Sequence, residues 1–244
     1  MQNKYVGDIG DFGKYGLLRA LCRKDVHLGV VWYLNPSEKD NKDGSLVRYL
    51  EKDAPGLESC DPDLFIILKG LVQNRKRSVS AIRGAGLLHG AVFVEKEVLP
   101  EDGASLDRRR VYRKEWHERA LQDTARAGLV FLDPDNGFSD DSARKHTKRA
   151  AKYVFRDELE SYLRRGQSVI LYQHQTRKGT LDEQVQDKMK LFKRLSVTHE
   201  VWALTYHRQQ VRIYFVFAAR DEHVLKSRTG EFMKGSWQQH FRRG

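Results

Sequence analysis

Residues 129–137 read LVFLDPDNG, a short apolar run that leads directly into a turn with two aspartates. Such a run is typical of a strand buried on both faces, as in a parallel sheet. Pro134 stiffens the exit from this strand, and Asn136-Gly137 permits a tight turn with positive φ. Because ligands of open α/β sheets bind beyond the carboxyl ends of the strands, we expect Asp133 to lie in a binding crevice.

Helices and strands alternate along the rest of the chain. Strands are predicted at residues 29–34, 91–98, 129–132 and 168–172, and helices at 12–24, 45–52, 62–74, 112–127, 142–165, 181–195 and 232–241. This alternation indicates an α/β fold with a doubly wound, mostly parallel, Rossmann-like sheet. Two further strands, predicted at 200–206 and 211–219, are too close in sequence for a parallel crossover. The sheet is therefore expected to end in an antiparallel hairpin.

The composition favours one globular domain. The 244 residues include five prolines, no repeat and no Ser/Gly-rich linker, which indicates a single domain over residues 1–244 with a helical insertion around 45–90. Two cysteines are too few for a disulfide scaffold or a Cys-only zinc site. The apolar runs are far shorter than the roughly 20 residues of a membrane span. The first residues lack a signal-peptide pattern, so we expect a cytoplasmic protein without a membrane partner.

The net charge of +11 is concentrated in the C-terminal part. Residues 1–141 contain 22 Lys/Arg and 23 Asp/Glu, whereas residues 142–244 contain 22 and 10. On the helix predicted at 142–165, four basic residues share one face, and no acid within 142–155 is spaced to pair with them: Lys145, Lys148, Lys152 and Arg156. Arg109 and Arg110 belong to a second basic cluster. Together the clusters favour nucleic acid, RNA or DNA, as the partner over a merely solvated surface.

Residues 7–14, GDIGDFGK, contain three glycines and end where a helix is predicted to begin. Backbone N–H groups in such a segment can bind an anion or a carboxylate, with Lys14 adding charge. The segment does not match a phosphate-binding P-loop, which follows a strand and continues from Lys to Ser or Thr. We interpret it as a ligand-binding loop, and the simpler alternative is a helix start capped by Asp11.

The layout resembles that of class I S-adenosylmethionine-dependent methyltransferases. It is most similar to the adenine amino-group methyltransferases of the RlmJ type, which act on large-subunit ribosomal RNA. Asp133-Pro134 matches the first half of their Asp/Asn-Pro-Pro-aromatic motif, which hydrogen-bonds the target amine and stacks its base. Residues 5–15, YVGDIGDFGKY, resemble the Gly-rich segment that opens the RlmJ type, and the terminal hairpin is another shared hallmark. Asp135 and Asn136 depart from the motif, and the glycine motif expected after the first strand is absent.

The resemblance implies a methyltransferase that uses S-adenosylmethionine and acts on nucleic acid, with the adenine amino group as acceptor. Five residues would carry the catalytic site: Asp133, Pro134, Asn136, Phe138 and His174. In this interpretation Asp133 accepts a hydrogen bond from the amine, and Phe138 supplies the stacking face for an extruded base. Five residues would line the cofactor pocket: Gly10, Asp11, Lys14, Asn35 and Glu95.

Two other functions stay open at this point. Asp133, Asp135 and His174 could bind a divalent ion for phosphodiester hydrolysis, which would make the protein a metal-dependent nuclease or phosphodiesterase. Alternatively, the basic clusters could belong to a nucleic-acid-binding module without catalytic activity. The leading interpretation needs no metal, and the sequence does not indicate an oligomeric state.

Overall fold

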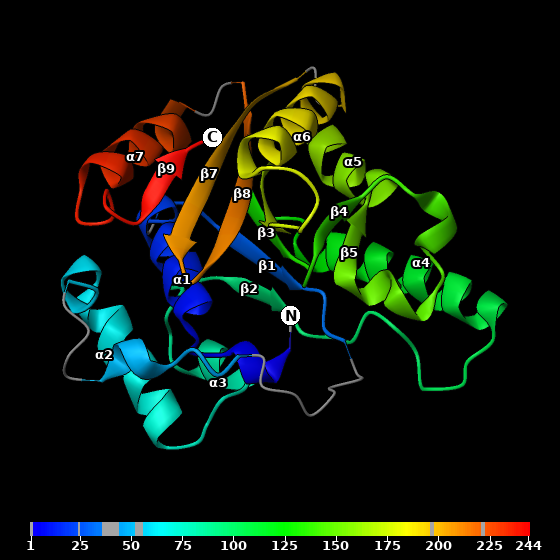
Figure 1. Ribbon diagram of the computed structural model, residues 1–244. Coiled ribbons are helices and arrows are strands. Elements are labelled where there is room, and N and C mark those ends of the chain that lie inside the picture. Colours follow the sequence, from blue (N-terminus) through cyan, green and yellow to red (C-terminus); the bar gives the residue numbers. More distant parts are fainter. Residues whose placement is uncertain (1, 24, 36–43, 52–55, 196–197, 221–222) are drawn as a thin grey trace.

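The computed structural model describes residues 2–23, 25–35, 44–51, 56–195, 198–220 and 223–244. Its main sheet (Figure 1) contains seven strands, namely β1 (Leu28–Trp32), β2 (Val92–Val94), β3 (Leu129–Asp133), β6 (Ser168–His174), β7 (His199–Arg208), β8 (Gln210–Ala219) and β9 (Phe241–Arg243). Their order across the sheet is β2-β1-β3-β6-β8-β7-β9. The first four strands are parallel, whereas β8, β7 and β9 each run antiparallel to the preceding neighbour. The predicted α/β fold with a terminal antiparallel hairpin is confirmed.

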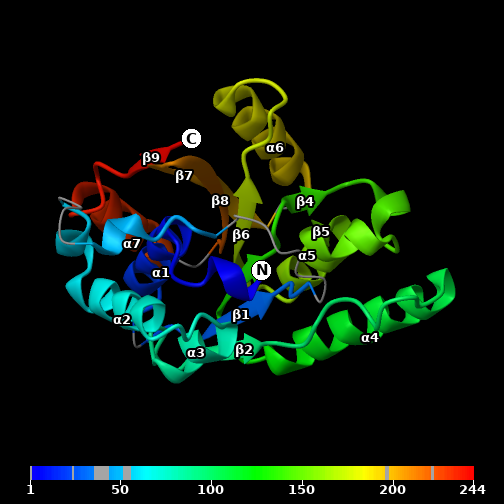
Figure 2. The ribbon, with the colours of Figure 1, turned by 60° about the horizontal axis from the view of Figure 1, so that its bottom comes forward.

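Helices cover both faces of this sheet, in two groups that Figure 2 separates. On one face lie α1 (Ile9–Leu21), α2 (Pro62–Gln73), α3 (Val79–Gly84) and α7 (His223–Lys234), and on the other α4 (Leu106–Asp123), α5 (Arg156–Arg164) and α6 (Leu181–Leu195). Successive residues of a strand point to opposite faces. Accordingly, Val30 of β1 joins the core on the α1 side and Val31 joins the core on the α4 side. Because helices bury both faces of the sheet, a ligand is expected to bind at the carboxyl ends of the strands.

Helix α1 begins three residues earlier than predicted, because Asp8 and not Asp11 caps it. The Asp8 side chain accepts a hydrogen bond from Asp11 N at 2.9 Å. Gly10 and Gly13 therefore lie inside the helix, where they allow side chains of the β7–β8 hairpin to approach it, whereas Gly7 precedes the cap. A Cβ on Gly10 would lie under 3.0 Å from the guanidinium of Arg212, and a Cβ on Gly13 would lie 2.6 Å from the Tyr206 ring.

The prediction of one long helix at residues 142–165 is wrong. The chain there forms two 3-10 helices, η4 (Ser142–Arg144) and η5 (Lys148–Lys152), followed by β5 (Tyr153–Phe155) and only then α5. Strand β5 pairs in parallel with β4 (Gly137–Ser139) to make a small second sheet. Glu158 accepts a hydrogen bond from Phe155 N at 3.1 Å and so caps a new helix at this point. The basic residues predicted on one helix face are divided among three segments: Lys145 follows η4, Lys148 and Lys152 belong to η5, and Arg156 begins α5.

Smaller differences concern short segments. The helix predicted at 45–52 is represented by the 3-10 helix η2 (Arg48–Leu50), and two further 3-10 helices are η1 (Asn3–Tyr5) and η3 (Glu58–Cys60). In the predicted tail helix, α7 ends at Lys234 and Phe241 begins β9. The region of the predicted helical insertion contains α2 and α3, whose apolar residues join the core on the α1 side. Within the described ranges, no helix is long and apolar enough to cross a membrane.

Candidate active site

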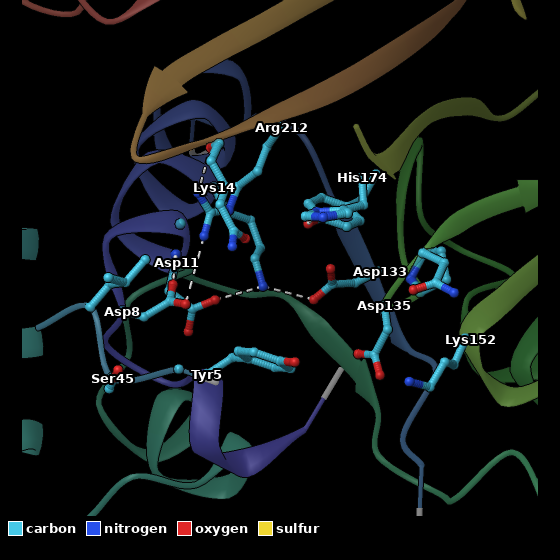
Figure 3. A pocket seen from close by; sticks show the side chains of 17 residues that line it. Tyr5, Asp8, Asp11, Lys14, Ser45, Asp133, Asp135, Lys152, His174 and Arg212 are labelled. Atoms are coloured by element: carbon cyan, nitrogen blue, oxygen red, sulfur yellow. Dashed lines mark hydrogen bonds and ion pairs between the residues drawn. The ribbon is translucent and has the colours of Figure 1, made fainter. Parts of the chain in front are cut away.

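A cavity of about 400 Å³ lies where β3 and β6 end and β8 begins. Asp133 and His174, the last residues of β3 and β6, line it together with Arg212 of β8. Figure 3 shows that the N-terminal segment supplies the facing side, with Tyr5 and the first turns of α1 directed toward Asp133. The cavity thus occupies the edge of the sheet at which a ligand site is expected.

Three charged side chains meet inside this cavity. Lys14 Nζ lies 2.7 Å from Asp11 Oδ1 and 2.8 Å from Asp133 Oδ2, as Figure 3 shows. Lys14 is only 5% exposed and Asp133 only 3%, so this ion-paired cluster is shielded from bulk water. Asp11 also accepts a hydrogen bond from Gly7 N at 3.2 Å, which ties the carboxylate to the entry of α1.

The pKa values of Lys14 and Asp11 follow from burial and from their mutual charges. Burial would lower the pKa of Lys14, but the charges of Asp11 and Asp133 raise it well above its ordinary value. Lys14 therefore remains an ammonium group at neutral pH and donates hydrogen bonds. Burial raises the pKa of Asp11 from 3.8 to about 6, although the charge of Lys14 opposes this rise. Asp11 thus changes its charge just below neutral pH.

Arg212 is a member of this site that the sequence interpretation missed. Its side chain is largely buried beside Gly10, and Nη2 lies 3.7 Å from Asp8 Oδ2. Nη1 donates a hydrogen bond to Gln210 O at 2.9 Å. The sequence does contain a signal for it, because Arg212 is the one charged residue of the apolar strand predicted at 211–219. A charged side chain in a buried strand requires a partner and therefore points to a site.

The other side of the cavity is formed by the segments that follow β3 and β6. His174 N donates to Asn136 O at 3.1 Å, so the two strand ends are held together by their backbones. The Tyr172 hydroxyl lies 3.5 Å from Nδ1 of His174. Burial, and to a smaller extent the charge of Arg212, lowers the pKa of His174. A neutral imidazole at this position can accept one hydrogen bond and donate another.

The cavity brings together most of the residues that the sequence placed in the site. Its lining includes Gly10, Asp11, Lys14, Asp133, Pro134, Asn136 and His174. It also includes Asp135, which was predicted only as a metal ligand, and Lys152, which was assigned to the basic surface. Residues of the lining that were not predicted include Tyr5, Asp8, Ser45 and Tyr172. The glycine-rich and Asp-Pro segments therefore belong to one site, although they are far apart in sequence.

Three predicted site residues lie outside this lining. Phe138 is 4% exposed, and its ring packs edge-on against Phe192 at a centroid distance of 5.1 Å, so it does not offer a face to the cavity. Glu95 follows β2 and pairs with Arg83 at 3.3 Å. Asn35 follows β1 and is also not among the lining residues, and residues 36–43 beyond it lie outside the described ranges.

The predicted basic residues differ in their surroundings. Lys145 pairs with Asp157 and with Glu158, and Arg156 pairs with Asp140, so the expectation of uncompensated charge is wrong for these two. Lys152 lines the cavity and Lys148 is exposed near it in sequence.

The second basic cluster lies beside the segment that follows β4. Arg109 Nε donates to His146 O at 2.7 Å, which brings the start of α4 next to this segment. Arg110 is exposed and lies 3.7 Å from Asp107. The contact at Arg109 makes the two predicted clusters neighbours in space.

Among the described residues, no group of three or more His, Cys, Asp or Glu side chains is arranged to hold a metal ion. No protein-family model matches the sequence, and no curated protein is similar to it.

Proposed function

We propose that this protein transfers a methyl group from S-adenosylmethionine to an amino group of nucleic acid, with the exocyclic amine of adenine as acceptor. The position of Asp133 carries the proposal: its carboxylate stands at the end of β3 inside the cavity and is held by Lys14. Asp133-Pro134 resembles the first half of the motif by which adenine amino-group methyltransferases hold the amine. The terminal hairpin of β7 and β8 agrees with the same resemblance.

The side chains of the cavity suit the chemical groups of S-adenosylmethionine. This cofactor carries a positive sulfonium, an ammonium and a carboxylate. Asp8 offers a carboxylate to the positive groups, and Arg212 offers a guanidinium to the carboxylate. The volume of about 400 Å³ also falls in the range of small-molecule sites, roughly 300–1,000 Å³. When bound, S-adenosylmethionine supplies an activated methyl group.

The acceptor side of the reaction rests on Asp133. Its carboxylate can accept a hydrogen bond from the amine, which orients the nitrogen lone pair, and it can take the proton that the nitrogen releases. Lys14 remains protonated because its pKa is raised, so its role is to hold the Asp133 carboxylate in place. Tyr5 and Tyr172 line the same cavity and take over from Phe138 as candidates for contact with the base.

The surface beside the cavity supports nucleic acid as the substrate. Exposed basic residues lie on the neighbouring segments joined by Arg109: Arg108, Arg110, Lys148 and Arg149. Lys152 is a further basic residue of this region and lines the cavity, where Figure 3 shows it beside Asp135. Such groups bind phosphates and fix the orientation of a strand without reading its sequence.

The metal-dependent alternative receives less support from this geometry. In that alternative Asp133 would bind the ion together with Asp135 and His174, but the ammonium of Lys14 already lies 2.8 Å from Asp133 Oδ2. A positive charge at this point repels a second cation.

The proposal is tested by following transfer of a labelled methyl group to single-stranded RNA and DNA that contain adenine. Asp133→Ala is expected to lower the transfer rate by about 100-fold or more, the usual effect of losing a group that positions or accepts the proton. Asp187→Asn, whose side chain is 80% exposed on α6, serves as the matched control and should retain the wild-type rate. Equal rates for Asp133→Ala and the wild type would contradict the proposal.

A further inference from the structure

A second cavity, of about 500 Å³, adjoins the one that contains Asp133. The two cavities share Ser45 and Leu46 as a common wall. At two places in the chain, one residue lines one cavity and the next residue lines the other. Ile9 lines the second cavity and Gly10 the first, and in the same way Gln209 lines the second and Gln210 the first. The tip of the β7–β8 hairpin therefore stands at the junction of the two cavities.

The backbone at this tip is held in an unfavourable conformation. Gln209 has a φ of 60°, in the left-handed region that residues other than glycine rarely adopt, and Arg208 and Gln210 on either side of it are paired. Such a residue persists only where its surroundings force it, and residues of this kind are concentrated at functional sites.

Contacts from two sides keep the tip in place. Arg212 Nη1 donates to Gln210 O at 2.9 Å and to Arg208 O at 3.4 Å, from within the first cavity. On the other side, Arg208 Nε donates to His240 Nδ1 at 3.0 Å, and His207 N donates to His240 O at 2.8 Å. The position of the tip is thus coupled to the same arginine that lines the proposed active site.

The second cavity has an apolar interior and a polar rim. Ile9, Leu46 and the largely buried Tyr49 supply apolar surface, while Arg48 and Gln209 are exposed. A base needs an apolar contact for its face, hydrogen-bonding groups for its edge and a cation for its phosphate. A glutamine amide both donates and accepts, which suits a base edge. The chemistry of this cavity therefore matches one nucleotide of a single strand.

We propose that the second cavity binds the nucleotide next to the one whose base enters the first cavity, with Gln209 reading its base and Arg48 holding its phosphate. This inference rests on the proposed function, since it assigns the neighbouring position of the same substrate. It makes the protein selective for a short sequence around the target and not for a single base. Arg212 is the positioning residue that keeps the reading residue aligned with the site of reaction.

The first test measures binding of fluorescein-labelled 12-nucleotide single strands, one of RNA and one of DNA, over a series of salt concentrations. Arg48→Ala should weaken binding and make the negative slope of log affinity against log salt less steep by about 0.7, the value for one phosphate contact on a single strand. Arg194→Ala removes one exposed charge at the end of α6, away from the tip, and serves as the control. Arg48→Gln should reproduce the effect of Arg48→Ala. A wild-type slope in both Arg48 variants, with the fold intact by circular dichroism, would overturn the assignment.

The second test measures sequence preference with oligonucleotides randomised on either side of a central adenine. Gln209→Gly removes the amide and relaxes the left-handed backbone, so the variant should stay folded while its preference at one neighbouring position is lost. An unchanged preference would contradict the reading role. Failure of the proposed function would be seen in a different measurement, because the wild type would then not bind S-adenosylmethionine. That result does not depend on how the Arg48 and Gln209 variants bind oligonucleotides.

Discussion

Lys14 Nζ lies 2.8 Å from Asp133 Oδ2, although the two residues are 119 positions apart in the sequence. This ion pair joins α1 to the carboxyl end of β3 and holds the carboxylate on which the proposed reaction depends. Because Asp11 flanks the same ammonium at 2.7 Å, one lysine is the counter-ion that two buried carboxylates share. Its removal should therefore have large consequences.

Replacing Lys14 by methionine should destabilise the fold by roughly 3–5 kcal/mol, the range observed when one partner of a buried ion pair is removed. Asp11 and Asp133 would then face each other as like charges without a counter-ion. Unfolding in urea measures the loss. Lys190→Met, in which the lysine side chain is 71% exposed, is the matched control and should change the free energy of unfolding by less than about 0.5 kcal/mol. A similarly small change for Lys14→Met would contradict this role for the lysine.

The raised pKa of Asp11 predicts a specific pH dependence of stability. A carboxyl group whose pKa is 3.8 when unfolded and about 6 when folded binds its proton more tightly in the folded protein. Its contribution therefore favours folding fully below pH 3.8 and is lost as the pH rises through about 6. The free energy of unfolding of wild type minus that of Asp11→Asn should decrease across this window. A difference that is flat between pH 4 and 6.5, or that increases, would contradict the assignment.

Gly10→Ala tests the close approach of Arg212 to α1. The added Cβ would lie under 3.0 Å from the guanidinium, so either the arginine or the helix must shift. Overpacking of this kind costs about 1–3 kcal/mol, and displacement of Arg212 should also weaken binding of S-adenosylmethionine. Gly70→Ala on α2, where a Cβ meets nothing within 4 Å, is the control and should leave binding unchanged. Wild-type stability and binding in Gly10→Ala would show that this contact is not required.

Neutralising the exposed residues Lys148 and Arg149 should weaken binding of single-stranded oligonucleotides in a salt-dependent manner. Two lost phosphate contacts on a single strand would make the negative slope of log affinity against log salt less steep by about 1.4. The double substitution Lys193→Ala with Arg194→Ala, on α6, removes equal charge from another helix. If both double variants lose the same affinity, binding depends on net charge and not on this surface.

The elements governed by local periodicity were predictable from the sequence. Helix α6 has the predicted bounds, and β3 differs only by the inclusion of Asp133. The region 142–165 was not predictable in the same way. Ala151, Phe155 and Leu159 are all buried at helical spacing, but Phe155 belongs to a strand because β5 pairs with β4. A pairing between segments outweighed the local pattern there.

The candidate site was predictable in part. The residue types of the Asp-Pro and glycine-rich segments indicated a shared crevice, and the structure brings them into one cavity. The direct contact of Lys14 with Asp133 could not be inferred, because it depends on how closely α1 packs on the hairpin through Gly10 and Gly13. Gly10 and Gly13 were interpreted as part of a loop, because the sequence does not show which side chains approach them in the helix. Phe138 was misplaced because its distance along the chain from Asp133 says nothing about the side on which its ring packs.

Calorimetric titration of the folded protein with S-adenosylmethionine tests the central proposal most directly. We expect saturable binding with one site per chain, an affinity that is reduced in Arg212→Ala, and unchanged binding in the control Asp187→Asn. Absence of measurable heat with a protein whose fold is intact by circular dichroism would contradict the proposal that this cavity binds the methyl donor.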